Sequence, residues 1–184
     1  FDVAKNYKFI WDEIYFFRNT DEIISKGKTE AHLDDRYFLN SKNLEFSNKK
    51  KILKSKYKTE IVDINNDTHY QISNFKLSLE DEILIGENIS INNDYSKPLN
   101  NKFFIKSGIF DLKNKSFSTQ DINIELKKNL FSNEKNDPRL KGVSSSSKDG
   151  VTIINKGVFT SCSKKNECPP WSLQAEKIEY DENK

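Results

Sequence analysis

Two cysteines and two histidines are the residues of this chain best suited to metal or thiol chemistry. Cys162 and Cys168 are separated by five residues, which is neither the C-x-x-C spacing of a thiol oxidoreductase nor half of a zinc site, since a second cysteine pair is lacking. The histidines, His32 and His69, are remote from them in the sequence. We therefore expect no metal. A local disulfide would contribute about 2 kcal/mol through loop entropy, and the alternative is a pair of reduced thiols.

Acidic side chains occur in adjacent pairs, such as Asp12-Glu13 and Asp34-Asp35. Neighbouring side chains of a strand point to opposite faces, so such a pair is not arranged for acid/base catalysis, and it is typical of a solvated surface. The serine run at 144–147 has no nearby histidine and no Gly-x-Ser-x-Gly elbow. The sequence therefore predicts no enzyme and no cofactor.

The composition excludes further classes of protein. The net charge is +2, acidic and basic residues are interspersed, and arginine occurs only at positions 18, 36 and 139, so we expect no nucleic-acid partner. No apolar run approaches the roughly 20 residues that span a bilayer as a helix. The apolar fraction of 35% is lean, whereas 12% aromatic residues argue against disorder. A fold with a thin core, or with one face left open, fits best.

Short alternating strands are the elements that would position these side chains. Apolar residues recur with a period of two, for example in Ile83–Ile91, and clusters of Asn, Asp, Lys and Ser between them indicate hairpin ends. A loose repeat relates Tyr37–Ile52 to Tyr70–Ile85 by a shift of 33 positions (70 minus 37). The pattern predicts an all-β sheet, rolled or stacked, with little helix.

We divide the chain into three parts. Residues 1–130 are built from the repeat, 131–150 form a loop-rich segment around the serine run, and 151–184 hold the final strands and a Cys-Pro-Pro-Trp connector. Proline fixes φ and restricts the residue before it, so the connector is a rigid extended arm. The chain begins at Phe1 with neither methionine nor signal peptide, and we expect it to be a segment of a longer protein.

The alternating apolar residues allow two interpretations, a closed sandwich core or the wall of a ligand groove. The candidates for the inner face are Ile14, Phe16, Leu44, Phe46, Ile72, Leu77, Ile83, Ile85, Ile89, Ile91, Phe104, Ile109, Leu112 and Phe117.

The last quarter of the chain carries three motifs, Asn136-Asp-Pro-Arg-Leu-Lys-Gly142, Phe159-Thr-Ser-Cys162 and Cys168-Pro-Pro-Trp-Ser-Leu-Gln-Ala-Glu-Lys-Ile178. In this order they resemble the end of the periplasmic domain in the LptD (OstA) family of lipopolysaccharide-assembly outer-membrane proteins, just before the transmembrane barrel. The first 130 residues share with that family only the repeated short strands.

The resemblance implies an antiparallel β-jelly roll, rolled or V-shaped, whose apolar inner face binds the acyl chains of lipid A and passes lipopolysaccharide to a C-terminal barrel. It implies a position at the periplasmic face of the outer membrane. The implied partners are lipopolysaccharide, an LptA-like periplasmic bridge joined by edge-strand pairing, the protein's own barrel and an LptE-like plug lipoprotein. A soluble LptA-like bridge and a closed-core structural β-domain are the alternatives.

The resemblance also gives the C-terminal residues roles. In relatives the F-T-S-C cysteine, matched here by Cys162, bridges to a cysteine of the barrel, whereas a bond between Cys162 and Cys168 would compete with that bridge. Both cysteines are thus expected to be structural disulfide partners in an oxidising compartment. Pro169, Pro170 and Trp171 would fix the exit of the chain toward the barrel, or simply begin an anchored strand.

Overall fold

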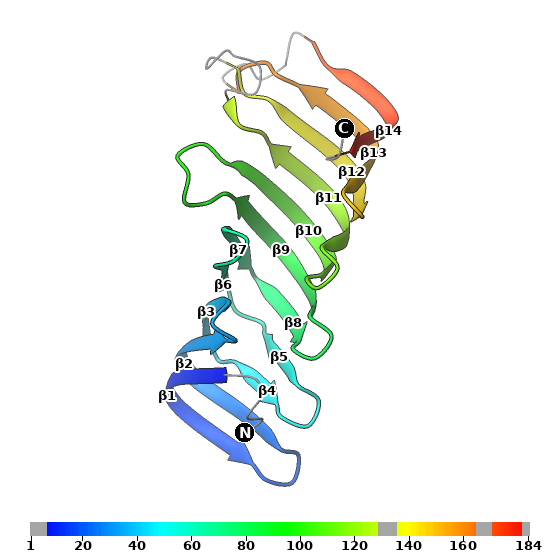
Figure 1. Ribbon diagram of the computed structural model, residues 1–184. Coiled ribbons are helices and arrows are strands. Elements are labelled where there is room, and N and C mark those ends of the chain that lie inside the picture. The colour runs from blue at the N-terminus through cyan, green and yellow to red at the C-terminus, as the bar shows by residue number, and fades with distance from the viewer. Residues whose placement is uncertain (1–6, 129–135, 165–170, 182–184) are drawn as a thin grey trace.

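A computed structural model of the chain describes residues 7–128, 136–164 and 171–181. These residues form one 14-stranded antiparallel sheet without an α-helix (Figure 1), which confirms the all-β prediction and is compatible with the β-jelly-roll class. The strands are β1 (Tyr7–Phe17), β2 (Glu22–Leu33), β3 (Tyr37–Lys42), β4 (Glu45–Ser47), β5 (Ile52–Ser55), β6 (Thr59–Asp63), β7 (Thr68–Ile72), β8 (Asn74–Ser78), β9 (Ile83–Asn93), β10 (Asn101–Asp111), β11 (Ser116–Glu125), β12 (Arg139–Lys148), β13 (Val151–Thr160) and β14 (Leu173–Asp181).

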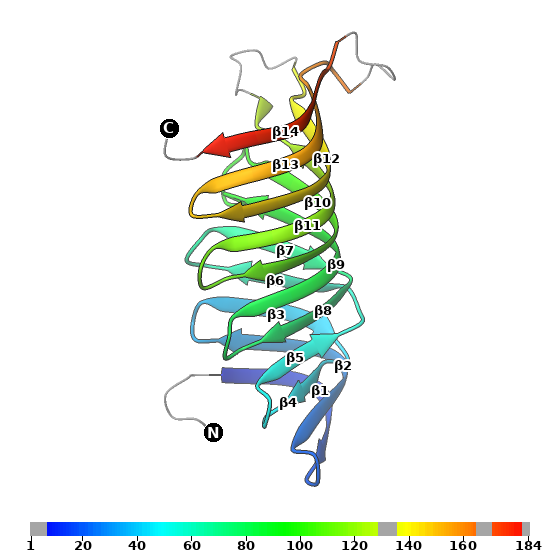
Figure 2. The same ribbon diagram turned by 90° about the vertical axis from the view of Figure 1, so that its right-hand side faces the viewer.

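We call each crossing of the sheet by the chain a pass. Consecutive passes are neighbours in the sheet, so the fold is a long antiparallel meander (Figure 2). Three passes consist of two short strands each, namely β3 with β4, β5 with β6, and β7 with β8. The long strands span both parts of such a pass, because β2 pairs with both β3 and β4, and β9 pairs with both β7 and β8. Local hairpins therefore account for the whole topology.

A bend near the middle of each pass divides the sheet into two arms. Arm A contains β3, β6, β7 and the halves of the long strands aligned with them, and arm B contains β4, β5, β8 and the other halves. Several residues at the bend have positive φ, a conformation that Gly, Asn and Asp tolerate best. These are Gly27, Asn43, Asn88, Asp121 and Lys156.

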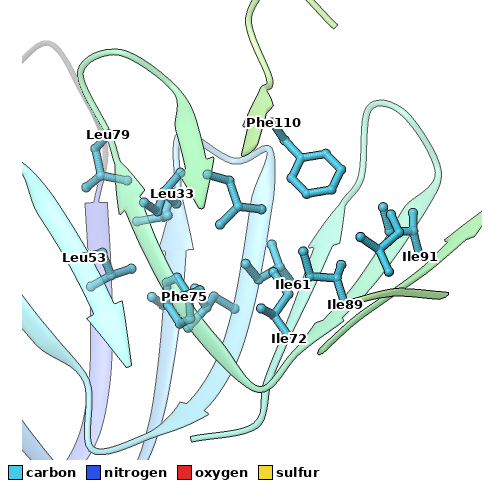
Figure 3. Close-up of a cluster of buried hydrophobic side chains, with 14 of the residues drawn as sticks. Leu33, Leu53, Ile61, Ile72, Phe75, Leu79, Ile89, Ile91 and Phe110 are labelled. Atoms are coloured by element: carbon cyan, nitrogen blue, oxygen red, sulfur yellow. The ribbon is translucent and has the colours of Figure 1, made fainter. Parts of the chain in front are cut away.

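Apolar side chains on one face of each arm form the core. In arm A one row of directly opposed residues crosses the sheet through Phe9, Ala31, Leu39, Ile61, Tyr70, Ile91, Phe103, Ile124, Leu140, Phe159 and Leu173. The corresponding row of arm B runs through Phe16, Ile23, Phe46, Leu53, Leu77, Leu84, Phe110 and Phe117. Figure 3 shows buried members of this core from both arms.

The structure corrects the period of the repeat. Pairing through β6 makes Thr68 the equivalent of Tyr37, a shift of 31 positions (68 minus 37), whereas Asn101 follows Thr68 at 33 (101 minus 68). The predicted shift of 33 was therefore two residues too long for the first repeat. An even error in the shift moves no side chain to the other face of its strand.

The sheet also continues through the predicted segment boundaries. Residues 139–148, which belong to the predicted loop-rich segment, form β12 and pair with β11 and β13. The serines of this strand carry short hydroxyl side chains, and Ser145 is buried opposite Thr119. The low apolar content of this segment suggested a loop. β12 nevertheless forms because it pairs with the strands on both sides, and it does not depend on the strand propensity of its serines.

Candidate functional site

The inner faces of the two arms pack directly against each other near the bend. Isoleucine side chains from one arm fill the space above glycines of the other: Ile72 at Gly86, Ile154 at Gly142 and Ile178 at Gly157. Added Cβ atoms at these glycines would clash with the isoleucines. The bend is thus closed by close-packed side chains, and the apolar interior lies between the arms.

Ten of the fourteen candidate groove residues lie on this inner face. Leu44, Phe46, Ile72, Leu77, Ile89 and Ile91 are buried in the core. Leu112 and Phe117 are partly buried and pack against it. Ile14 and Phe16 occupy inner-face positions of β1 but are largely exposed, since β1 is the edge strand at one end of the sheet.

The prediction is wrong for the other four candidates, Ile83, Ile85, Phe104 and Ile109, which lie on the outer face. Ile85 and Ile109 are directly opposed in the ladder and are 44% and 50% exposed. In both strands the neighbouring residue takes the inner position, namely Leu84 in β9 and Phe110 in β10.

Sequence reasoning also missed much of the inner face. The missed residues share an apolar side chain, a strand position and deep burial, and they include Leu33, Leu39, Leu53, Ile61, Phe75, Leu84, Ile105, Phe110, Ile122, Ile124 and Ile154. Alternation was the signal that could have found them, as in Ile122-Asn-Ile124.

The apolar interior reaches both ends of the described sheet. Within the described residues, β1 pairs only with β2 and β14 only with β13, so each leaves a backbone edge without a neighbouring strand. Inner-face side chains are exposed there, with Phe16 of β1 at 55% and Leu173 of β14 at 63%. At the β1 end, Phe9 stacks on Trp11 and contacts Phe46 of arm B, with ring centroids 5.6 and 5.5 Å apart. Both ends therefore offer apolar surface beside unpaired strand edges.

A charged cluster lies on the side opposite the bend, where the turns of the two arms approach each other. We call this side the mouth. The Arg36 guanidinium is 3.2 Å from the carboxylate of Asp63, also in arm A, and 3.3 Å from that of Glu82 in the β8–β9 turn of arm B. Its carbon Cζ lies 4.5 Å from the ring centroid of Tyr37. Burial raises the pKa of Tyr37 well above its usual range, and burial also raises the pKa of Tyr70 to about 12. Both tyrosines are thus neutral at ordinary pH.

The motif segments of the C-terminal quarter meet at the end of arm A. Arg139 donates hydrogen bonds to the backbone carbonyls of Asp137 and Cys162. The carboxylate of Asp137 accepts a hydrogen bond from the backbone N–H of Lys164 at 2.9 Å and lies 3.1 Å from the ammonium of Lys128. The hydrogen bond from the Lys164 backbone, with help from Lys128, holds the pKa of Asp137 below its usual value. The segment around Cys162 is therefore fixed by the Asp-Pro-Arg motif.

The third motif joins the same assembly through its tryptophan. The hydroxyl of Thr160 donates to the Trp171 carbonyl at 2.8 Å, and the rings of Phe159 and Trp171 lie 5.9 Å apart. Cys162 is buried beside them. Cys168, Pro169 and Pro170 lie outside the described residues, so the disulfide and the connector stay predictions.

No group of three or more His, Cys, Asp and Glu residues in the described ranges could hold a metal ion. No helix in the same ranges is long and apolar enough to cross a membrane. Comparison of the sequence with protein-family models and with curated proteins returns no match. Function is therefore inferred from the motifs and from the geometry of the interior.

Proposed function

We propose that this chain is the periplasmic domain of an LptD-like lipopolysaccharide translocon of the outer membrane, which binds lipid A acyl chains between its arms and passes lipopolysaccharide to a barrel. The observation that carries this proposal is the uninterrupted row of apolar residues inside arm A, from Phe9 in β1 to Leu173 in β14. Each CH₂ kept out of water contributes about 0.8 kcal/mol, so an acyl chain that crosses an aqueous space needs such continuous surface. Transport of this kind needs no catalytic residue.

The C-terminal motifs support the same assignment. They are the segments that resemble the family, and Asp137, Arg139, Thr160 and Trp171 join them by side-chain hydrogen bonds. A connector that leads into a rigid barrel benefits from such a fixed base. Cys162 would then be held in place for its disulfide partner.

The proposed partners follow from the two sheet edges. The edge of β1 would pair with an LptA-like periplasmic bridge, continuing both the ladder and the apolar interior. The β14 end would face the protein's own barrel, which holds an LptE-like plug lipoprotein. In this arrangement the domain would lie at the periplasmic face of the outer membrane. A soluble LptA-like bridge would use the same interior and edges but would have no barrel to which the Cys-Pro-Pro-Trp connector could lead.

One observation favours a different candidate, a structural β-domain with a closed core. Leu39, Leu53 and Ile72 are completely buried, so lipid could enter the middle of the interior only if the arms separate. A closed core predicts that no lipid enters under any condition.

Photocrosslinking in cells that produce the full-length protein separates these candidates. A photoreactive phenylalanine analogue replaces Phe103, whose side chain packs against the core, or its neighbour Phe104, whose side chain lies on the outer face. Lipopolysaccharide adducts at Phe103 but not at Phe104 are expected. Adducts at neither position, in protein that folds normally, would establish the closed core.

A further inference from the structure

The mouth between the arms is bridged by the ion pair of Arg36 and Glu82. Arg36 belongs to the turn between β2 and β3 at the rim of arm A, and Glu82 ends the turn between β8 and β9 at the rim of arm B. The ion pairs of Lys127 with Asp94 and of Lys54 with Glu45, in contrast, each stay within one arm. The contact between Arg36 and Glu82 is therefore an ion pair that bridges the rims of the two arms.

The bridge is firmly anchored in arm A alone. Asp63, whose side chain is 2% exposed, holds Arg36, and it also accepts hydrogen bonds from the backbone and side-chain nitrogens of Asn66 at 3.1 and 2.7 Å. The Glu82 side chain is 33% exposed. The pair of Arg36 and Glu82 is only partly buried and is therefore weakened by solvent, so the bond to Glu82 can break while Arg36 keeps its place on Asp63 and Tyr37.

The space behind the bridge is suited to a molecule with an apolar and a polar part. A cavity between the rims is lined by apolar side chains of both arms, including Leu33, Tyr37, Leu77 and Leu112. The Tyr37 hydroxyl and the Arg36 Nε are buried and have no hydrogen-bond partner among the described residues. Such atoms are costly to leave unpaired, and the polar part of a ligand seated in the mouth would satisfy them.

We infer that the Arg36–Glu82 pair is a gate that the polar head group of the transported lipid must open. This inference rests on the proposed function. A lipid whose acyl chains move inside the arms from β1 toward β14 carries its head group along the mouth, because a bulky polar group is excluded from the apolar interior. A bridge across the mouth blocks that path until it opens. The Nε of Arg36 and the hydroxyl of Tyr37 would bind the head group while the gate is open.

A chemical lock tests the gate in cells that produce the full-length protein. Arg36→Cys and Glu82→Cys are combined and joined by a short bis-maleimide, and each single variant with the same reagent is the control for reaction at Cys162 and Cys168. The photoreactive analogue is placed at Phe16, before the gate, or at Phe103, beyond it. The lock is expected to leave the lipopolysaccharide adduct at Phe16 and to remove that at Phe103.

The remaining outcomes distinguish two failures. Adducts at Phe103 that persist in the locked protein would overturn the gate and leave the proposed function standing. No adduct at Phe103 even in the unlocked protein would overturn both.

A lipid-free measurement tests the bridge itself. Glu82→Gln is expected to speed amide hydrogen exchange in the facing turns by about two- to fivefold, since a partly exposed ion pair contributes little stability. Glu80→Gln, in the same turn but outside the ion pair, is the matched control and should change nothing. Equal exchange in the two variants would show that Glu82 does not hold the rims together.

Discussion

The guanidinium of Arg139 donates a hydrogen bond to the backbone carbonyl of Cys162, 23 positions away in the sequence. The same nitrogen also donates to the carbonyl of Asp137. One side chain thereby ties the Asp-Pro-Arg motif to the Phe-Thr-Ser-Cys motif. This nitrogen is held in the rigid plane of the guanidinium, whereas the ammonium of a lysine would rotate freely at the end of a flexible chain.

Arg139→Ala should loosen the segment that carries Cys162. Both carbonyls lose a charge-assisted hydrogen bond, and we expect a loss of about 1.5–3 kcal/mol in the free energy of unfolding, measured by urea denaturation. In a reduced Cys168→Ser background, the Cys162 thiol should react faster with maleimide than in the parent. Arg18→Ala, in the exposed β1–β2 turn, is the matched control. An unchanged thiol rate in Arg139→Ala would show that the arginine does not shield this segment.

Asp137 should make stability depend on pH. Its pKa is lower in the folded chain than in the unfolded chain, so its contribution is present above the ordinary carboxyl pKa of about 4 and is lost as the pH falls through the folded value. Asp137→Asn should therefore lower the unfolding free energy at pH 7 by about 1–2 kcal/mol. The difference from the parent should shrink in acid. A difference that stays constant from pH 7 to pH 2 would assign the effect to packing rather than to charge.

The all-β class could be predicted because alternation is a local signal. The assignment of faces could be predicted only where polar residues interrupt the apolar ones. In Ile83-Leu84-Ile85 every residue is apolar, so the run does not show which residues face inward, and the prediction placed Ile83 and Ile85 inside when Leu84 is the buried residue. The pairing of β9 decides this, because Leu84 lies opposite Leu77 of β8 and Phe110 of β10 in the buried row.

The bend and the mouth could not be predicted from the sequence. Asn43 and Asn88 look like ordinary turn residues, yet they stand at bends within passes of the sheet rather than at hairpin ends. Arg36 and Glu82 are 46 positions apart, and they meet only because the sheet folds on itself. Contacts of this kind depend on the angle between the arms, and that angle leaves no local pattern in the sequence.

Backbone conformation at the bend predicts different effects for two substitutions. Gly27 has a φ of +86°, and a Cβ there would lie 3.1 Å from the Cβ of Asp12, so Gly27→Ala should destabilise the fold by about 1–3 kcal/mol. Asn88 has a φ of +48°, and Asn88→Gly relieves that positive φ without adding atoms. We expect Asn88→Gly to be neutral or slightly stabilising. Thermal unfolding of both variants measures this, and equal losses would show that positive φ does not govern the bend.

The two neighbours Ile109 and Phe110 give the sharpest test of which face is inside. Phe110 is 6% exposed and contacts Phe117 with ring centroids 6.0 Å apart, whereas Ile109 is half exposed on the outer face. Phe110→Ala should lower the unfolding free energy by about 3–5 kcal/mol, because it removes buried area and leaves a cavity between the arms. Ile109→Ala should change it by no more than about 0.5 kcal/mol. Urea denaturation measures both, and a larger loss at Ile109 would reverse the two faces of β10 and, with them, the position of the apolar interior.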